Sequence, residues 1–335
     1  ASLPSRGRNR YTADMIADIV SQLLPIFIII GIGTLLRVKK LLAPATMEQL
    51  KTLIINVSLP AVLFLSFFRM DLRPEMWLIA TIVFVVCVLL YLFGRALAPV
   101  AGPFGAYLPF LSTGFEFGMM GAVFFGAAFG MDNMSYIAVI ALGHEIFIWF
   151  VYFTLIRSKE SPDSAKESLG AAVLRFLRSP IIIGIIAGLL LNVIGLERLL
   201  RGNPVGDGIV TSLEYLTGLT IPLILIVLGY GLRFRIDGLK QIALFSVLRL
   251  ALVLAAAIAI DFLVFRALLD LPRLFSAALY TFVILPPPFI LPLFVSPTTT
   301  AKHEQRALIT NTLVFYSTLS IAVFAVFYVV FSLAG

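Results

Sequence analysis

The chain has 335 residues, of which 60% are hydrophobic and only 13% are charged, and its mean hydropathy is +1.05. This composition excludes a soluble globular domain and predicts an all-α polytopic membrane protein. The net charge of +7 does not indicate nucleic-acid binding, because the basic residues fall in short loops between apolar segments. A single Cys87 and two histidines exclude an internal disulfide framework and argue against a metal centre.

Ten apolar segments are long enough to cross a bilayer, which takes about 20 residues per helix. They follow a polar, basic tail at residues 1–16, which lacks the apolar core of an export signal. The largest polar interruption, at 158–175, predicts a cytoplasmic loop between two sets of five, at 17–157 and 176–335. We place the spans at 17–36, 52–69, 76–98, 107–130, 134–157, 176–195, 209–232, 241–268, 274–297 and 306–333.

The fourth and the ninth of these spans contain many residues that break helices. The fourth has Gly114, Gly118, Gly121 and Gly126 with Glu116 among them, and the ninth has Pro286, Pro287, Pro288 and Pro292. Both hold the same rank in their set of five. Unwound backbone inside a membrane is tolerated only beside protein or a water-filled cavity. Interrupted spans at matching positions therefore indicate the binding site of a secondary transporter.

The two sets of five spans resemble each other in sequence. Leu59–Phe64 (LPAVLF) in the second span is similar to Ile221–Ile226 (IPLILI) in the seventh. Because each set has an odd number of spans, the second copy must enter the membrane upside down, which predicts an inverted repeat. Most Lys and Arg residues of the loops fall on the side of the central loop. The positive-inside bias then places both termini outside.

Three short motifs carry a family resemblance. Asn56–Pro60 (NVSLP), Thr113–Phe115 (TGF) and Pro286–Pro292 (PPPFILP) are similar to segments of the auxin efflux carrier family, within the bile/arsenite/riboflavin-type transporter superfamily. The resemblance implies ten helices in two inverted repeats, with broken helices 4 and 9 that cross, as in sodium/proton antiporters. It also implies a homodimeric carrier in which spans 1, 2, 6 and 7 form the scaffold and the other spans move.

This chain departs from the family pattern at three points. Ser112 or Thr113 stands at the crossover asparagine, and Met119 or Met120 stands at the proline that usually follows the first crossover. Glu116 stands where many members have an apolar residue. Plant members of the family export auxin, and bacterial members are associated with malonate, malate and other small carboxylates.

Glu116 is the leading candidate for ion coupling. An ionised carboxylate in mid-membrane costs several kcal/mol, about 2.5–3.5 on insertion scales, unless it is paired, hydrated or protonated. Such a position suits a proton carrier. The alternative is a protonated glutamate that only caps the amides of a broken helix.

His144 and Glu145, near the middle of the fifth span, are the second candidates for coupling. Neighbouring residues point about 100° apart on a helix, so the two side chains cannot face one partner. We expect one of them to face the crossover and the other a neighbouring helix. Histidine changes charge near neutrality and suits a proton relay or a pH sensor; the alternative is a hydrogen-bonded packing residue.

The broken backbones are expected to bind the substrate directly. Half-helix N-termini attract an anionic carboxylate without Arg or Lys, whereas carbonyls freed by proline suit a cation such as Na⁺. Asp261 is predicted to be interfacial and Arg249 to snorkel toward the cytoplasm. The predicted substrate-binding residues are Asn56, Ser58, Thr113, Gly114, Glu116, Phe117, Pro287, Pro288, Phe289 and Asn311, with the two asparagines alternatively serving as contacts between helices.

The function predicted is secondary transport of small organic anions, carboxylates above all, by elevator-type alternating access across the cell (inner) membrane. Coupling to H⁺ or Na⁺ and a homodimer in the lipid bilayer are expected, with no organic cofactor, metal or nucleic acid. Two alternatives stay open, a Na⁺/H⁺ antiporter and a membrane sensor built on a transporter fold. An enzyme is disfavoured, because no diphosphate-binding aspartate pair, zinc motif or serine–histidine arrangement is found.

Overall fold

The computed structural model describes residues 24–70, 74–160, 177–196, 203–231, 238–295 and 299–333, together with residues 170, 173–174 and 200. Throughout these residues the chain forms helices and no strand, as the composition predicts. The basic tail and most of the central loop lie outside the described residues. The elements in chain order are the helix Leu24–Val38, α2 (Pro44–Leu53), η1 (Ile54–Ser58), α3 (Leu59–Phe68), α4 (Glu75–Leu97), η2 (Ala98–Val100), η3 (Gly102–Phe104), α5 (Leu108–Ser112), η4 (Phe117–Gly121), α6 (Ala122–Phe129), η5 (Met131–Asn133), α7 (Met134–Phe147), η6 (Ile148–Tyr152), α8 (Phe153–Glu160), α10 (Pro180–Val193), α12 (Pro204–Gly218), α13 (Thr220–Gly231), α14 (Leu239–Ile260), η8 (Asp261–Arg266), α15 (Arg273–Ile284), α16 (Leu291–Phe294) and α17 (Thr300–Leu333).

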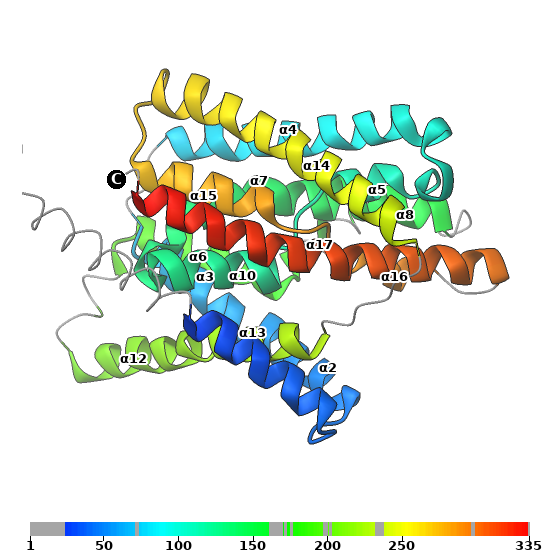
Figure 1. The fold of residues 1–335 in the computed structure, drawn as a ribbon. Coiled ribbons are helices and arrows are strands. Elements are labelled where there is room, and N and C mark those ends of the chain that lie inside the picture. The colour runs from blue at the N-terminus through cyan, green and yellow to red at the C-terminus, as the bar shows by residue number, and fades with distance from the viewer. Residues whose placement is uncertain are drawn as a thin grey trace, which may run out of the picture.

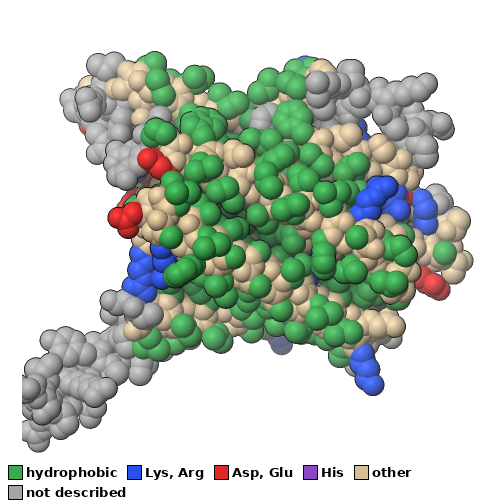
Figure 2. Space-filling view, turned by 90° about the horizontal axis from the view of Figure 1, so that it is seen from above, with side chains coloured by type: hydrophobic (Ala, Val, Ile, Leu, Met, Phe, Trp, Pro, Cys, Tyr) green, Lys and Arg blue, Asp and Glu red, His purple; other side chains and the backbone are tan. Residues whose placement is uncertain are grey.

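Seven helical stretches in the described residues are long and apolar enough to cross a membrane, and three apolar helices are shorter. Figure 2 shows that apolar side chains cover the middle of one face, while charged side chains gather toward its two ends. Such an apolar belt between charged ends suits a helical bundle in a bilayer. Local sequence places several helix starts, since Pro44, Pro180 and Pro204 begin α2, α10 and α12, where the missing proline N–H costs no hydrogen bond.

The helices fall into two groups by their contacts. The first group contains Leu24–Val38, α2–α3, α10 and α12–α13, and the second contains α4 to α8 and α14 to α17. In Figure 1 α2, α12 and α13 lie along the lower side, α4 and α14 lie along the upper edge, and α17 runs between them. The start of the first helix (blue) and the C-terminal end of α17 (red) lie at the same end of the bundle.

Close helix packing in the first group depends on glycines. A Cβ on Gly33 would collide with the carbonyl of Ile226, and a Cβ on Gly188 would collide with the carbonyl of Phe64. Phe64 and Ile226 occupy the same place in the two similar segments LPAVLF and IPLILI. The same contact of a glycine with a carbonyl therefore occurs at matching positions of the two predicted copies.

Side-chain caps recur at matching positions as well. The Asn192 amide donates to the carbonyls of Phe67 (2.8 Å) and Met70 (2.6 Å) at the end of α3. In the other copy, Thr34 donates to Gly229 O (2.9 Å) and Arg37 to Tyr230 O (3.0 Å) at the end of α13. Carbonyls in the last turn of a helix lack intrahelical partners, and in each case the first helix of the other predicted copy supplies the donors.

Asp261, which was predicted to be interfacial, lies inside the protein rather than on its surface. Its side chain is buried, in η8 at the end of α14. The carboxylate accepts hydrogen bonds from Ser276, from Tyr280 (3.2 Å) and from Arg266 (2.7 Å). These donors satisfy the buried charge and attach α14 to α15.

Candidate functional site

The predicted fourth span is interrupted at residues 113–116, called the first break below. Helix α5 ends at Ser112, and the π-helical turn η4 begins at Phe117. Gly114 has φ +72°, a left-handed conformation that costs other L-residues about 1–2 kcal/mol. Glu116 is the N-cap of η4, where Oε1 accepts a long bond of 3.4 Å from Met119 N.

The predicted ninth span is interrupted at residues 285–290, called the second break. Helix α15 ends at Ile284 and α16 begins at Leu291. Because Pro286, Pro287 and Pro288 have no N–H, the carbonyls one turn earlier lose their normal partners. The break's first amide donor after Leu285 is that of Phe289.

Three carbonyls at the second break take their partners from elsewhere in the fold, as buried backbone groups require. The Ser320 hydroxyl donates to Ile284 O (2.7 Å), and Arg249 Nη1 donates to Leu285 O (3.1 Å). The amide of Glu116 donates to Pro286 O (2.8 Å). The second break is therefore held by α17, α14 and the first break.

The two breaks also meet through the Glu116 side chain. Its Oε2 accepts a hydrogen bond of 2.7 Å from Phe289 N. A Cβ on Gly114 would stand 2.8 Å from Cγ of Pro288, so only glycine allows this approach. Glu116 is half-buried. Its carboxylate thus occupies amide donors at the broken helices, where the sequence predicted a substrate anion to rest.

Arg249 is the main functional candidate that sequence reasoning missed. It was expected to snorkel, but it is 4% exposed. Its Nη2 donates to Gly114 O (2.7 Å), in addition to the Nη1 bond to Leu285 O. The guanidinium also lies 5.1 Å from the ring centroid of Phe115 and 4.8 Å from that of Tyr316. The signal available in the sequence was an arginine about two turns inside an otherwise apolar span.

His144 faces the first break and is buried. Its Nε2 accepts a hydrogen bond of 2.9 Å from Phe115 N. Nε2 must be unprotonated to accept this bond, so a neutral His144 carries its proton on Nδ1. Nδ1 lies 3.4 Å from Oε1 of Glu145. Glu145 Oε2 accepts from Trp149 Nε1 on the next turn (3.1 Å).

A cavity of about 220 Å³ touches the second break at Phe289 and the turn that follows the first break at Met119, and we call it the Lys51 cavity. Lys51 of α2 is half-buried at its wall, and its ammonium group pairs with Glu48 at 2.7 Å. Lys51 is close enough to Glu116 for their charges to interact. The cavity lies between the two helix groups, and its full lining is Lys51, Met119, Val227, Leu228, Gly231, Phe289, Pro292, Thr310, Leu313, Val314 and Ser317.

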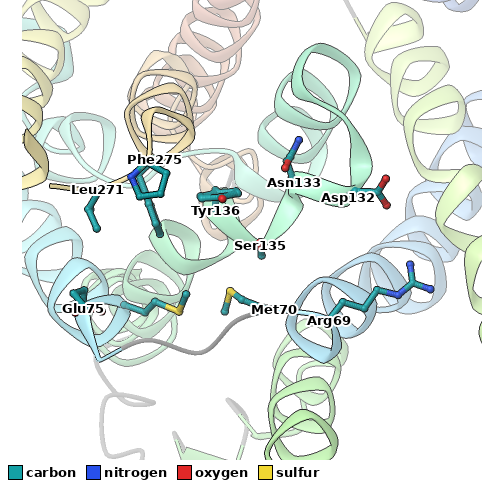
Figure 3. Close-up of a pocket in the computed structure, with 11 residues that line it drawn as sticks. Arg69, Met70, Glu75, Asp132, Asn133, Ser135, Tyr136, Leu271 and Phe275 are labelled. Atoms are coloured by element: carbon teal, nitrogen blue, oxygen red, sulfur yellow. The ribbon is translucent and has the colours of Figure 1, made fainter. Parts of the chain in front are cut away.

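Two further cavities, of about 230 and 400 Å³, lie around Arg69, and we call them the Arg69 cavities. Figure 3 shows the smaller one, where Arg69 and Met70 at the end of α3 face residues of η5, α7 and the start of α15. In the larger one, Arg69 pairs with Glu214 of α12 at 2.6 Å. No described lining residue of either cavity belongs to the two breaks.

The other predicted site residues are placed as follows. The buried Thr113 hydroxyl donates to Cys87 O (2.6 Å), and the Phe117 ring packs against Phe282. Pro287 and Pro288 are buried in the second break. Ser58 is buried in η1, outside the Lys51 cavity. Asn56 is exposed and donates to Thr52 O (2.7 Å), and the half-buried Asn311 neighbours the cavity residue Thr310.

The described residues contain no group of three or more His, Cys, Asp or Glu side chains able to hold a metal ion. The charged groups at the breaks are organised instead around backbone amides and carbonyls. Several membrane-length helices, together with two interrupted segments joined around Glu116 and Arg249, are typical of a polytopic membrane transporter.

Comparison with protein families agrees with this class. Residues 18–329 match the family model described as Membrane transport protein. The chain belongs to this family, which is the auxin efflux carrier family that its motifs resemble, and its members are transporters rather than enzymes. A search of curated proteins found no match.

Proposed function

We propose that this protein is a secondary carrier of small organic anions, with carboxylates as the substrate class. The observation that carries the proposal is Glu116, a protonatable group that accepts a hydrogen bond from the amide of Phe289, and Phe289 lines the Lys51 cavity. A substrate carboxylate needs the same kind of donor that Glu116 now uses. Protonation of Glu116 weakens it as an acceptor and releases the amide to the substrate, so anion binding and proton uptake are coupled.

The Lys51 cavity supports a small acid as substrate. Its volume of about 220 Å³ is below the roughly 300–1,000 Å³ of pockets for drug-sized ligands. Lys51, which pairs with Glu48, supplies a positive charge at its wall, whereas the hydroxyl groups of Thr310 and Ser317 donate to carbonyls of their own helix. A short carboxylate fits this combination of one cation and the backbone amide of Phe289.

The transport mechanism we propose is alternating access of the elevator type. The first helix group acts as the scaffold, and the second carries the breaks. The Lys51 cavity lies between the groups and reaches the breaks, whereas the Arg69 cavities do not reach them. The recurring glycine contacts and helix caps support an inverted repeat of two five-span copies.

The remaining parts of the proposal concern the membrane. Ten spans are counted when the three shorter apolar helices cross together with the seven long stretches. Spans 4 and 9 are then the broken pair that crosses in mid-membrane. The positive-inside bias places both termini outside the cell membrane, so that the Lys51 cavity opens to the cytoplasm. A homodimer through the scaffold completes the proposal.

Counterflow in proteoliposomes, with a series of mono- and dicarboxylates, tests this function. We expect saturable counterflow of at least one short acid. Lys51→Gln should raise the half-saturation concentration about 5- to 10-fold, since a partly exposed ion pair contributes about 1 kcal/mol. Lys51→Arg should retain the affinity of the wild type, and Lys240→Gln, which removes an exposed lysine from α14, is the matched control.

Two results would contradict the proposal. Binding of carboxylates without counterflow would favour a sensor. Movement of Na⁺ against H⁺ with no organic substrate present would favour an antiporter.

A further inference from the structure

We infer that Arg249 is a resident cation of the two breaks and takes the place of a coupling sodium ion. The inference deepens the proposed carrier function, because it selects between the two coupling ions that the sequence leaves open. It rests on the position of the guanidinium, which joins a carbonyl of the first break to a carbonyl of the second.

The two carbonyls are of the kind that a bound cation needs. Gly114 O lies just beyond the end of α5, and Leu285 O lies just beyond the end of α15. The C-terminal end of a helix carries partial negative charge and unpaired acceptors. At Leu285, the regular helical donor would be Phe289 N, which binds Glu116 instead. Two helix ends thus direct oxygen atoms to one point inside the protein, as in an oxygen-ligand site for a hard cation.

Arg249 already occupies this point. It bonds both carbonyls at 2.7 and 3.1 Å and lies over the rings of Phe115 in the first break and Tyr316 in α17. An arginine side chain keeps its charge at every physiological pH. A sodium ion on the same oxygens would lie within a few ångströms of the guanidinium and would be strongly repelled at low dielectric.

The charged side chains where the two breaks meet are also complementary to the backbone groups that they contact. The carboxylate of Glu116 lies on the amide donors Met119 N and Phe289 N, while the guanidinium of Arg249 lies on the carbonyl acceptors. Each polar end of the broken helices is therefore matched by a side chain of the protein itself. The contact between the two breaks therefore needs no metal cation to be stable. The guanidinium of Arg249 stays with the breaks when they move.

The first test is made on the wild-type protein without substrate. Thermal unfolding is measured in NaCl and in choline chloride at equal ionic strength, and carboxylate counterflow is measured in the same two salts. We expect the same melting temperature and uptake rates within about twofold, because a ligand that does not bind the folded state does not stabilise it. A melting temperature or an uptake rate that rises with Na⁺ over choline would overturn the inference.

The second test separates charge from packing. Arg249→Lys keeps the cation and Arg249→Met removes it, and Arg95→Met, at an exposed arginine of α4, is the matched control. We expect Arg249→Lys to retain measurable uptake and Arg249→Met to lose it, with Arg95→Met at the wild-type rate. Wild-type uptake by Arg249→Met, or equal loss in the Lys and Met variants, would contradict a role for the charge.

The outcomes of the two proposals remain distinguishable. If Arg249→Met does not fold, the salt dependence of the wild-type melting temperature still decides the inference. That measurement needs no substrate, so a failure to find a transported carboxylate would count against the proposed function alone.

Discussion

The two breaks interrupt their helices through different residue types. The first break uses a glycine in a left-handed conformation and carries a charged side chain, Glu116, whereas the second uses three consecutive prolines and carries no charge. The first break gives a side-chain acceptor to the second, and the second gives a backbone acceptor, Pro286 O, to the first. An interrupted helix inside a membrane must find partners for every freed backbone group, and here each break satisfies part of the other.

This difference assigns separate roles to the two breaks. The prolines leave Phe289 N as the first amide donor that the second break offers an anion. The first break controls access to that donor, because Glu116 occupies it. We therefore propose that the second break provides a fixed site and that the first break provides the group that responds to protons.

The largest expected effect comes from Gly114→Ala. Alanine would have to adopt φ +72°, and its Cβ would stand 2.8 Å from Cγ of Pro288. The left-handed conformation alone costs about 1–2 kcal/mol, and the collision adds to it. We expect the free energy of unfolding to fall by more than about 2 kcal/mol, measured by thermal unfolding, and transport to be lost, measured by counterflow.

Gly208→Ala is the control for this prediction. Gly208 lies inside α12 with no atom near the position of a Cβ. Alanine should stabilise that helix by about 0.5–1 kcal/mol. Equal melting temperatures for Gly114→Ala and the wild type would show that the two breaks do not need their close approach.

The second effect concerns pH and Glu116. Protonation of Glu116 removes a negative charge beside the bound anion, so wild-type affinity should rise as the pH falls, by at most about tenfold per pH unit for one proton. Glu116→Gln keeps the shape of the protonated side chain and should bind substrate with affinity that changes less than about twofold between pH 5.5 and 7.5. Substrate affinity against pH, for an acid that stays ionised throughout, is the measurement.

The other ionisable groups near Glu116 are His144, Glu145 and Lys51, with Arg249 as a fixed charge. His144→Gln serves as the comparison, because it removes the imidazole and leaves Glu116 in place. Identical pH profiles for the wild type and Glu116→Gln would remove Glu116 from coupling.

The smallest effect compares two hydroxyl groups, one at each break. Ser320 donates to Ile284 O, whose regular helical donor would be the N–H that Pro288 lacks, whereas Thr113 donates to Cys87 O in the middle of α4. Ser320→Ala should therefore cost about 1 kcal/mol and Thr113→Val only about 0.5 kcal/mol. Chemical denaturation or melting of the two variants measures this, and a larger loss for Thr113→Val would reverse the comparison.

Much of the architecture is predictable from local sequence. Apolar length predicts helices of membrane size, and Gly114 and Pro286–Pro288 predict where the fourth and ninth spans are interrupted. These predictions succeed because glycine and proline change the backbone of their own residue and its neighbours. The importance of Glu116 also follows locally, since a carboxylate among apolar residues and glycines requires a partner.

The tertiary structure alone decided which groups those partners are. Arg249 bonds Gly114 O across 135 residues of sequence, and Phe289 N reaches Glu116 across 173. Hydropathy treats Arg249 as a residue near the end of a helix and Lys51 as part of a loop, because it has no information on which helices lie side by side. The sequence by itself determined the helices, their breaks and the family; the packing of distant helices determined which charges lie at the breaks and which cavity reaches them.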